Sequence, residues 1–380
     1  MPGDGDRPKL KRLRIEGFRS IASSEIDFSD LDVLIGPNGA GKSNLIAFLR
    51  MVGFMLSSEG GLSLFTGRMG GASALLHDGP KLTSSIKGEI VIETAAGLND
   101  YAFRLEMAAG DTLIFAEERI RFRRHDLGDG QSWLDFGAGH RTPGLLTVSD
   151  DQGMETQRTI LQLMRGLGVF QFHDTSAESP LKRKSRIDGG HHLRGDGSNL
   201  AAFLFHMRSV APLHHRRIVG TIRLIAPFFD DFAIEDDQGY ALLQWRELGS
   251  DLIFGPGQVS DGLLRAMALT ALLLQPVATL PPIVVVDEPE LGLHPAGLQI
   301  VIGLFEAAAQ ARQCIVATQS PDFLRALAPE NVIVVDRAAR SSSFRRLHAA
   351  GLDAWLDDYG LDELWDMNLL GGRPGSLAAE

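Results

Sequence analysis

Cysteine and long apolar runs are the two things this sequence most nearly lacks. Its 380 residues include one cysteine, Cys314, so an internal disulfide framework is excluded and a reducing cytoplasm is favoured. No uninterrupted apolar run reaches the ~20 residues that a membrane helix needs. The N-terminal stretch MPGDGDRPKLKR has no apolar core of a signal peptide. We therefore expect a cytoplasmic protein with no membrane association.

An excess of basic residues is also missing. Lys and Arg number 37 against 48 Asp and Glu, which gives a net charge of −11. A protein that coats nucleic acid by bulk charge is usually basic, so any DNA contact must come from a local patch. The best candidate is Lys182–Arg186, near His191, His192 and Arg194, although a solvated loop is the simpler interpretation. The stretches LHHRRI and RIRFRRH are weaker candidates; alternation in the second predicts Arg121 and Arg123 on one exposed strand face.

The order of apolar patterns predicts an α/β fold. Short alternating segments between residues 86 and 122 predict an antiparallel sheet, and buried strands alternate with helices in the last third, which favours a parallel sheet. Residues ~57–85 are predicted as a loop, and GYALLQWREL as a strand. Helices are predicted in ETQRTILQLMRGL, SNLAAFLFHMRSV (with Ser198 or Asn199 as a possible N-cap), HHRRIVGTIRLIAPFF, AGLQIVIGLFEAAAQAR and SPDFLRALA. We expect one nucleotide-binding head over 1–380. Its parts are an N-terminal lobe (8–150), an inserted helical region (151–255), the C-terminal part of the core (256–340) and a tail (341–380).

The stretch GPNGAGKSN follows a predicted buried strand and precedes a predicted helix. It matches the phosphate-loop pattern, in which glycines let successive N–H groups face phosphate oxygens and the helix N-terminus faces the same anions. Lys42 would reach the β- and γ-phosphates of ATP, and the Ser43 hydroxyl would bind Mg²⁺. An ordinary glycine-rich turn is the alternative. The predicted ATP-binding residues are Gly36, Pro37, Asn38, Gly39, Ala40, Gly41, Lys42, Ser43 and Asn44.

Two carboxylates end the predicted buried strand in PIVVVDEPELGLHP. The carboxyl edge of a parallel sheet is where open α/β folds bind ligands. Asp287 is predicted to hold Mg²⁺, and Glu288 to orient the attacking water. A surface turn after a strand is the alternative.

Ser260, Asp261 and Gly262 open a predicted apolar helix in VSDGLLRAM. A hydroxyl and small residues at a helix N-terminus form a second anion site, which is best explained as serving the nucleotide of a partner molecule. A plain helix N-cap is the alternative.

Taken together, these motifs resemble the ABC-type ATPases of the SMC/RecF/OLD group, in particular its small standalone AAA-type ATPases without a long coiled coil. The resemblance implies ATP and Mg²⁺ as ligands and an ATP-dependent homodimer in which Ser260–Gly262 acts in trans. It places the D-loop at Glu290–His294 and a phosphate-contacting residue at Arg19 in GFRS. Gln171 in VFQFHDTS is the candidate Q-loop residue, while His173 and Asp174 are interpreted as a structural turn.

The switch position departs from the histidine of cassette transporters. It is Gln319, whose amide can donate a hydrogen bond but cannot carry a proton, so slow hydrolysis is expected with Lys42, Glu288 and Gln319 as catalytic residues. The implied function is ATP-driven head dimerisation in DNA repair, chromosome maintenance or phage defence. The alternative is a nucleotide-sensing regulator that signals to a partner effector. A transporter motor is disfavoured because VSDGLLR replaces LSGGQ, and a nuclease because no acidic cluster follows the core.

Overall fold

The chain divides into two compact units, which are described one at a time. The computed structural model describes residues 7–125, 132–147, 155–356 and 358–371. Unit 1 comprises Met1–Leu167, Pro329–Asp353 and Met367–Glu380, and unit 2 comprises Gly168–Ala328 and Ala354–Asp366. The boundary predicted between residues 150 and 151 and the last part of the predicted tail lie outside the described residues.

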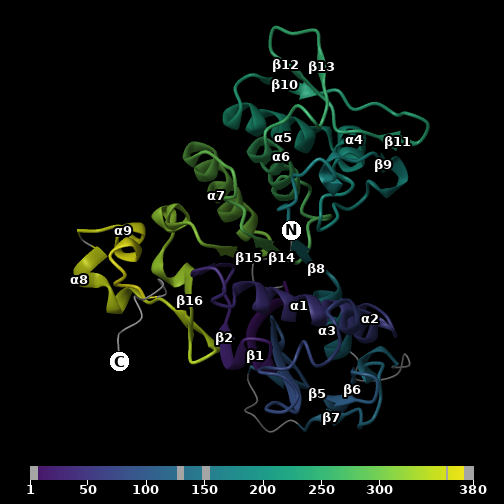
Figure 1. The fold of residues 1–380 in the computed structure, drawn as a ribbon, viewed down its shortest axis with the longest axis vertical. Helices are drawn as coiled ribbons and strands as arrows, with labels where there is room; N and C mark the ends of the chain where they lie inside the picture. The colour runs from purple at the N-terminus through teal and green to yellow at the C-terminus, as the bar shows by residue number, and fades with distance from the viewer. Residues whose placement is uncertain (1–6, 126–131, 148–154, 357, 372–380) are drawn as a thin grey trace. The chain divides into compact units, whose positions relative to one another are not determined.

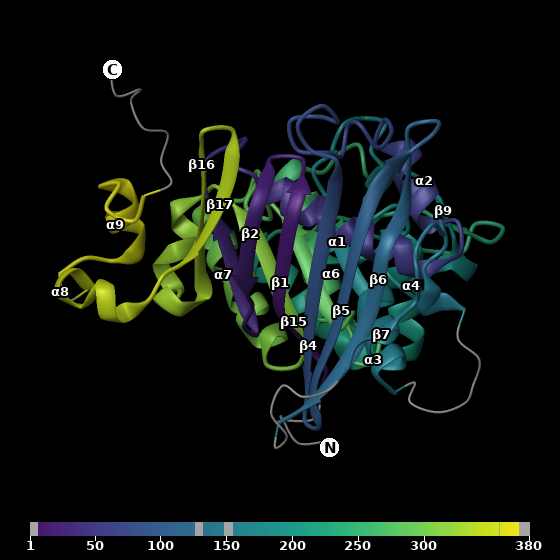
Figure 2. The ribbon, with the colours of Figure 1, turned by 90° about the horizontal axis from the view of Figure 1, so that it is seen from below.

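An antiparallel sheet forms one layer of unit 1, as the alternation between residues 86 and 122 predicts. Figure 2 shows its long strands side by side. Leu13 and Ile15 of the first strand are buried, so the apolar face is turned away from solvent. In spatial order the strands are β2 (Ile21–Asp27), β1 (Lys9–Phe18), β4 (Ser85–Thr94), β5 (Gly97–Ala108), β6 (Thr112–Arg124) and β7 (Leu134–Asp135).

A second group of strands in unit 1 brings the two ends of the chain together. Every residue of β3 (Leu31–Ile35) is buried, and β3 runs parallel to β16 (Val332–Ala338). Parallel strands buried on both faces read as continuous apolar runs, which is the pattern of the paired residues 33–35 and 332–334. Strand β17 (Ser341–Arg346), which no pattern in the sequence predicted, pairs antiparallel with β16.

Three α-helices lie among the described residues of unit 1. The expected helix α1 (Lys42–Ser57) buries Leu45, Ile46, Leu49 and Val52, and α3 (Glu155–Arg165) is also confirmed. The prediction of a loop over residues ~57–85 is wrong in part, because α2 (Gly61–Arg68) lies within it and buries Leu62 and Phe65. Glycine and serine lower intrinsic helix propensity, but the burial of these two side chains overrides it.

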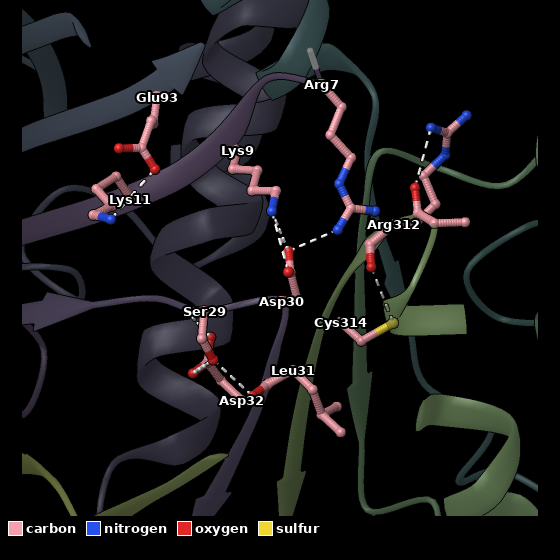
Figure 3. A network of polar contacts seen from close by, with 11 residues as sticks. Arg7, Lys9, Lys11, Ser29, Asp30, Leu31, Asp32, Glu93, Arg312 and Cys314 are labelled. Carbon is pink, nitrogen blue, oxygen red and sulfur yellow. Dashed lines mark hydrogen bonds and ion pairs between the residues drawn. The ribbon is translucent and has the colours of Figure 1, made fainter. Parts of the chain in front are cut away.

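Ion pairs hold the turn that leads into β3 (Figure 3). Arg7 and Lys9 both contact the Asp30 carboxylate, with N–O distances of 2.7 and 2.8 Å. The buried Asp32 accepts hydrogen bonds from the Ser29 hydroxyl and N–H. Arg346 of β17 pairs with the same carboxylate at 2.6 Å. Burial nevertheless raises the pKa of Asp32, since desolvation outweighs these partners. The entry to β3 is therefore fixed by contacts from both ends of the chain.

Unit 2 contains the central and later parts of the chain (Figure 1). Strand β14 (Ile283–Asp287) runs parallel to β15 (Gln313–Thr318), with Asp287 opposite Ala317. The predicted helices here are confirmed as α4 (Leu200–Val210), α5 (Pro212–Ile225), α6 (Asp261–Leu273) and α7 (Pro295–Ala309). The short elements are β8 (Leu167–Phe170), β9 (Ser185–Arg186), β10 (Phe229–Phe232), β11 (Tyr240–Ala241), β12 (Trp245–Glu247), β13 (Ile253–Phe254), α8 (Asp353–Leu356) and α9 (Leu361–Asp366).

Several local expectations in unit 2 are corrected. The segment GYALLQWREL forms two short strands in different sheets, β11 and β12, where one strand was expected. SPDFLRALA forms a 3₁₀ helix over Pro321–Ala326 in place of an α-helix. Asn199 occupies the N-cap of α4, but its side chain bonds to Arg194 N, Gly189 O and His192 O, so it fixes the preceding loop. No helix among the described residues has both the length and the apolarity needed to cross a membrane.

A buried carboxylate organises the far edge of the unit 1 sheet. Glu118 on β6 has 0% exposure and accepts hydrogen bonds from the Tyr101 hydroxyl and from the N–H groups of Gly144 and Leu145. Burial raises the pKa of Glu118, and these donors lower it only in part. One side chain thus holds the segment around Gly144 against the sheet.

We predict that Glu118→Ala lowers the free energy of unfolding by about 3 kcal/mol, because three buried donors lose their acceptor. Chemical denaturation of the purified variant measures this change. The matched control is Glu25→Ala, an exposed carboxylate on β2 in a surface ion pair with Arg12, which should cost less than ~1 kcal/mol. Equal losses for the two variants would contradict this account of Glu118.

The raised pKa of Glu118 also predicts a pH dependence. The folded state binds this proton more tightly than the unfolded state, so the stabilisation is fully present below the ordinary pKa of 4.5 and is lost as pH rises through the folded value. The difference in unfolding free energy between wild type and Glu118→Gln should therefore fall as pH rises above 4.5. A difference that stays flat or rises across that interval would show that Glu118 is not protonated preferentially in the fold.

Candidate functional site

The predicted phosphate loop of unit 1 lies between the buried strand β3 and helix α1. The Lys42 ammonium donates hydrogen bonds to the carbonyls of Gly36 and Pro37, at 2.5 and 3.2 Å, and the residue is only 4% exposed. Gly41 has a φ of 124°, and a Cβ there would lie 2.2 Å from the Ser342 Oγ atom. Only glycine fits this backbone, so the loop curls around its own lysine.

Two serines brace this loop from outside it. The Ser20 and Ser342 hydroxyls are 2.7 Å apart, and both residues are buried. Ser342 donates to the Ala40 carbonyl, while Ser20 accepts from the Asn44 amide at 2.7 Å. The sequence analysis missed both residues. Ser20 follows directly on the quoted Arg19, but nothing around Ser342 in RSSSFRR distinguishes it from its neighbours.

The start of α1 suits a polyphosphate. Its N-cap is Gly41, which has no side chain that could accept a hydrogen bond from the first turn, and that turn, Lys42–Leu45, has no acidic residue. The positive end of the helix dipole and the Lys42 ammonium therefore act in the same place without a competing carboxylate. The Ser43 hydroxyl lies in the same turn, and a hydroxyl oxygen is a type of ligand that Mg²⁺ accepts.

Arg19 lies in the turn between β1 and β2, directly before Ser20. Its φ of 48° is a left-handed conformation, held by its N–H donating to Leu75 O and by the His77 ring bonding to its carbonyl. The guanidinium contacts the Met69 sulfur at 3.2 Å, and burial lowers the pKa of Arg19. The backbone around Arg19 is thus tightly determined.

The acidic strand end in unit 2 is fixed by the predicted Q-loop segment. Asp287 is 4% exposed, and its Oδ2 atom accepts a hydrogen bond from the Gln171 amide at 3.0 Å. The His173 ring bonds to the Asp287 carbonyl at 2.9 Å. Gln171 and Asp287 are 116 residues apart in sequence, and the structure brings them into contact. His173 reaches this strand end, whereas Asp174 accepts bonds from Ser176 and forms the expected local turn.

Glu288 has a backbone conformation that side chains rarely adopt. Its φ is 47°, and its N–H donates to the Ala317 carbonyl of β15 at 2.7 Å. Non-glycine residues in this region cost of order 1–3 kcal/mol and cluster at functional sites. The chain leaves the strand direction here, directly after Asp287. Gln319 follows the end of the neighbouring strand β15, and its N–H donates to the Glu290 carboxylate at 3.0 Å.

The predicted signature element lies at the start of α6. Ser260 is the N-cap, and its hydroxyl accepts from the Leu263 N–H at 3.3 Å, so the N-cap interpretation holds locally. A Cβ on Gly262 would lie 1.9 Å from the Gly292 carbonyl, so the signature glycine packs directly on the predicted D-loop. The exposed Asp261 carboxylate is 4.0 Å from the Lys182 ammonium.

An arginine that the sequence analysis did not select connects these elements. Arg265 on α6 donates hydrogen bonds to the carbonyls of Phe172, His173 and Leu291 and to the Thr175 hydroxyl, at 2.8–3.2 Å. Its guanidinium therefore joins the signature helix, the segment after Gln171 and the D-loop. The available signal was a lone basic residue within an apolar helix.

The basic segments predicted as DNA contacts are engaged with acidic groups. In Lys182–Arg186, Arg183 pairs with Glu178, Lys184 with Asp237 and Arg186 with Asp188. The expectation that Arg121 and Arg123 lie on an exposed face is wrong. Both are partly buried, with side chains 20% and 22% exposed, and pair with the fully buried Asp100 at 2.6 and 2.8 Å.

The fold places the chain in a known class of protein. It is similar to a solved Smc head bound to the C-winged helix domain of ScpA, with 19% identity, a TM-score of 0.60 and coverage of 90% of this chain and 99% of that chain. It is also similar to an Smc head with an extended coiled coil bound to the C-terminal domain of ScpA derived from Pyrococcus furiosus, with 16% identity, a TM-score of 0.59 and coverage of 93% and 99%. The fold is therefore that of an ABC/SMC-type P-loop NTPase.

The family can be stated as well. Residues 33–325, well over half of the chain, match the family described as "AAA domain, putative AbiEii toxin, Type IV TA system", and the chain belongs to it. A comparison with curated protein sequences finds no match.

The contact between Gly262 and Gly292 yields a prediction. Gly262→Ala should lower the free energy of unfolding by about 1–3 kcal/mol, because the added methyl group overlaps a backbone carbonyl. Gly303→Ala in α7 is the matched control. A Cβ there meets none of the described atoms within 4 Å, so that variant should gain ~0.5–1 kcal/mol. Thermal and denaturant unfolding measure both changes, and a neutral Gly262→Ala would contradict the packing described.

Proposed function

We propose that this protein binds Mg²⁺–ATP and hydrolyses it slowly. One observation carries the proposal: a phosphate loop whose lysine is held at its own carbonyls, with its glycine fixed by close packing against Ser342. The Gln171–Asp287 hydrogen bond in unit 2 supports it, because polar residues that touch at a strand's carboxyl end suit phosphate chemistry.

The residues proposed to act on one nucleotide come from both the N-terminal and the C-terminal parts of the chain. The likeness to the Smc head covers 90% of this chain, so it extends over parts of both units. In this arrangement Gly36–Asn44 holds the phosphates, with Arg19 beside them. Ser43 and Asp287 would hold Mg²⁺, which when bound neutralises phosphate charge.

The remaining residues would act on the attacking water, on the γ-phosphate or on the Asp287 carboxylate. Glu288 orients and polarises the water, Gln171 positions the Asp287 carboxylate, and Gln319 donates a hydrogen bond to the γ-phosphate. Because a glutamine amide does not titrate, Gln319 contributes no pH dependence near neutrality. Hydrolysis then relies on Glu288 alone for proton transfer, which accords with slow turnover.

We propose further that ATP joins two heads. Ser260, Asp261 and Gly262 of one subunit would meet the γ-phosphate bound by Lys42 of the other, because a helix N-terminus attracts anions. Asp261 weakens this attraction, and its proximity to Lys182 offsets part of that charge.

The biological role proposed is DNA-linked, in repair, chromosome maintenance or phage defence, within the cytoplasm. The ion pairs of Lys184 and Arg186 are exposed, and exposed pairs contribute little and exchange readily, so a phosphate backbone could replace their carboxylates. A second candidate is a nucleotide-sensing regulator that signals to a partner effector, which the non-titrating Gln319 favours. Phosphate release measured with duplex, single-stranded and no DNA separates the two.

Loss of the phosphate-loop lysine tests nucleotide binding. Lys42→Ala should weaken ATP binding by about 10- to 100-fold, since a charged hydrogen-bond donor is removed. Calorimetry with Mg²⁺–ATP measures the affinity. Lys87→Ala, an exposed lysine on β4 of the same unit, should bind as wild type does. Equal affinity for wild type and Lys42→Ala would refute the assignment of the loop.

Removal of the proposed base tests the dimer. Glu288→Gln should retain ATP binding, lose phosphate release and accumulate as a dimer with ATP, because closure is no longer reset. Size-exclusion chromatography with light scattering, with ATP and with ADP, reports the mass. A species that stays monomeric with ATP would rule out ATP-driven head closure.

A further inference from the structure

Glu290 accepts a hydrogen bond at the point where the pairing of strands β14 and β15 ends. Strands β14 and β15 are parallel, and the last backbone bond between them runs from the Glu288 N–H to the Ala317 carbonyl. Continued parallel pairing would direct the Gln319 N–H to the Glu288 carbonyl. The chain turns away at Glu288, where φ is 47°, and the Gln319 N–H donates to the Glu290 Oε1 atom at 3.0 Å.

The carboxylate of Glu290 is largely withdrawn from water. The Oε2 atom of Glu290 is buried, and burial raises the pKa of this carboxyl group. The Gln319 N–H and the Thr318 hydroxyl lower that pKa in part, and the neighbouring Glu288 raises it further. The Thr318 hydroxyl in turn accepts from the Ser320 N–H at 3.0 Å. Three consecutive residues at the end of β15 are thus organised around one side chain of the D-loop.

We propose that Glu290 is a positioning residue for hydrolysis: its carboxylate replaces the missing backbone acceptor and fixes the Gln319 backbone, so that the Gln319 amide can meet the γ-phosphate. This inference rests on the ATPase function proposed above. Glu290 touches no reacting atom in this scheme and acts only through Gln319. It also links the switch residue to the D-loop, whose Gly292 carbonyl packs on Gly262 of the signature helix. A displacement of the signature helix is thereby carried to Gln319.

The test compares two substitutions at this position. Glu290→Ala removes the acceptor, so kcat for ATP should fall about 10-fold while KM changes less than about twofold, because the phosphate loop is untouched. Glu290→Gln retains an oxygen acceptor in its amide and should restore most of the rate. Hydrogen exchange of the peptide containing Gln319 should accelerate in Glu290→Ala and not in Glu290→Gln. Glu306→Ala, an exposed glutamate on α7, is the matched control and should behave as wild type.

The outcomes separate this inference from the proposed function. Wild type that releases no phosphate refutes the ATPase proposal and this inference with it. If wild type is active and Lys42→Ala is not, the function stands, and Glu290→Ala with an unchanged kcat then overturns the positioning role alone. A Glu290→Gln variant as slow as Glu290→Ala also overturns it, because charge and not the hydrogen bond would then be what matters. A thermal melt within ~2 °C of wild type excludes misfolding as the cause in either variant.

Discussion

The hydrogen bonds of the Arg265 guanidinium hold helix α6 to two other segments of unit 2. The guanidinium satisfies three backbone carbonyls and one hydroxyl from two separate segments, and a planar fork of fixed donors is suited to this. Those segments carry Gln171 and the predicted D-loop, and the helix that carries Arg265 begins with the predicted signature element. Gln171 in turn fixes the Asp287 carboxylate. Arg265 therefore holds together helix α6, the segment that follows Gln171 and the predicted D-loop.

The parts of the site that the sequence predicts are those defined by local chemistry. The phosphate loop can be predicted because glycine, lysine and serine at this spacing are typical of phosphate binding. Strand β14 can be predicted because a fully apolar run ends in two carboxylates. The antiparallel strands of unit 1 were predicted from the alternation of apolar and polar residues, and the structure confirms them.

Contacts between residues that are distant in the sequence could not be predicted from local patterns. Ser20 and Ser342 are separated by 322 positions, and no feature of either neighbourhood indicates the other. Arg121 and Arg123 alternate as exposed residues would, yet the buried Asp100 on the adjacent strand draws both inward. Helix α2 was missed because two buried side chains outweigh weak intrinsic propensity. In each case the local structure depends on contacts with residues that are distant in the sequence, and a single sequence does not identify those residues.

The dependence of the phosphate loop on β16 and β17 has a consequence for how the protein is made. Synthesis proceeds from the N-terminus, so the loop leaves the ribosome roughly 300 residues before Ser342, which holds its glycine and its Ala40 carbonyl. During that interval β3 lacks its parallel neighbour β16, and an apolar strand with open backbone groups is exposed to aggregation. Nucleotide affinity is then a property that the nascent polypeptide acquires at the very end of translation, and a message truncated shortly before Ser342 would yield a chain unable to organise the loop.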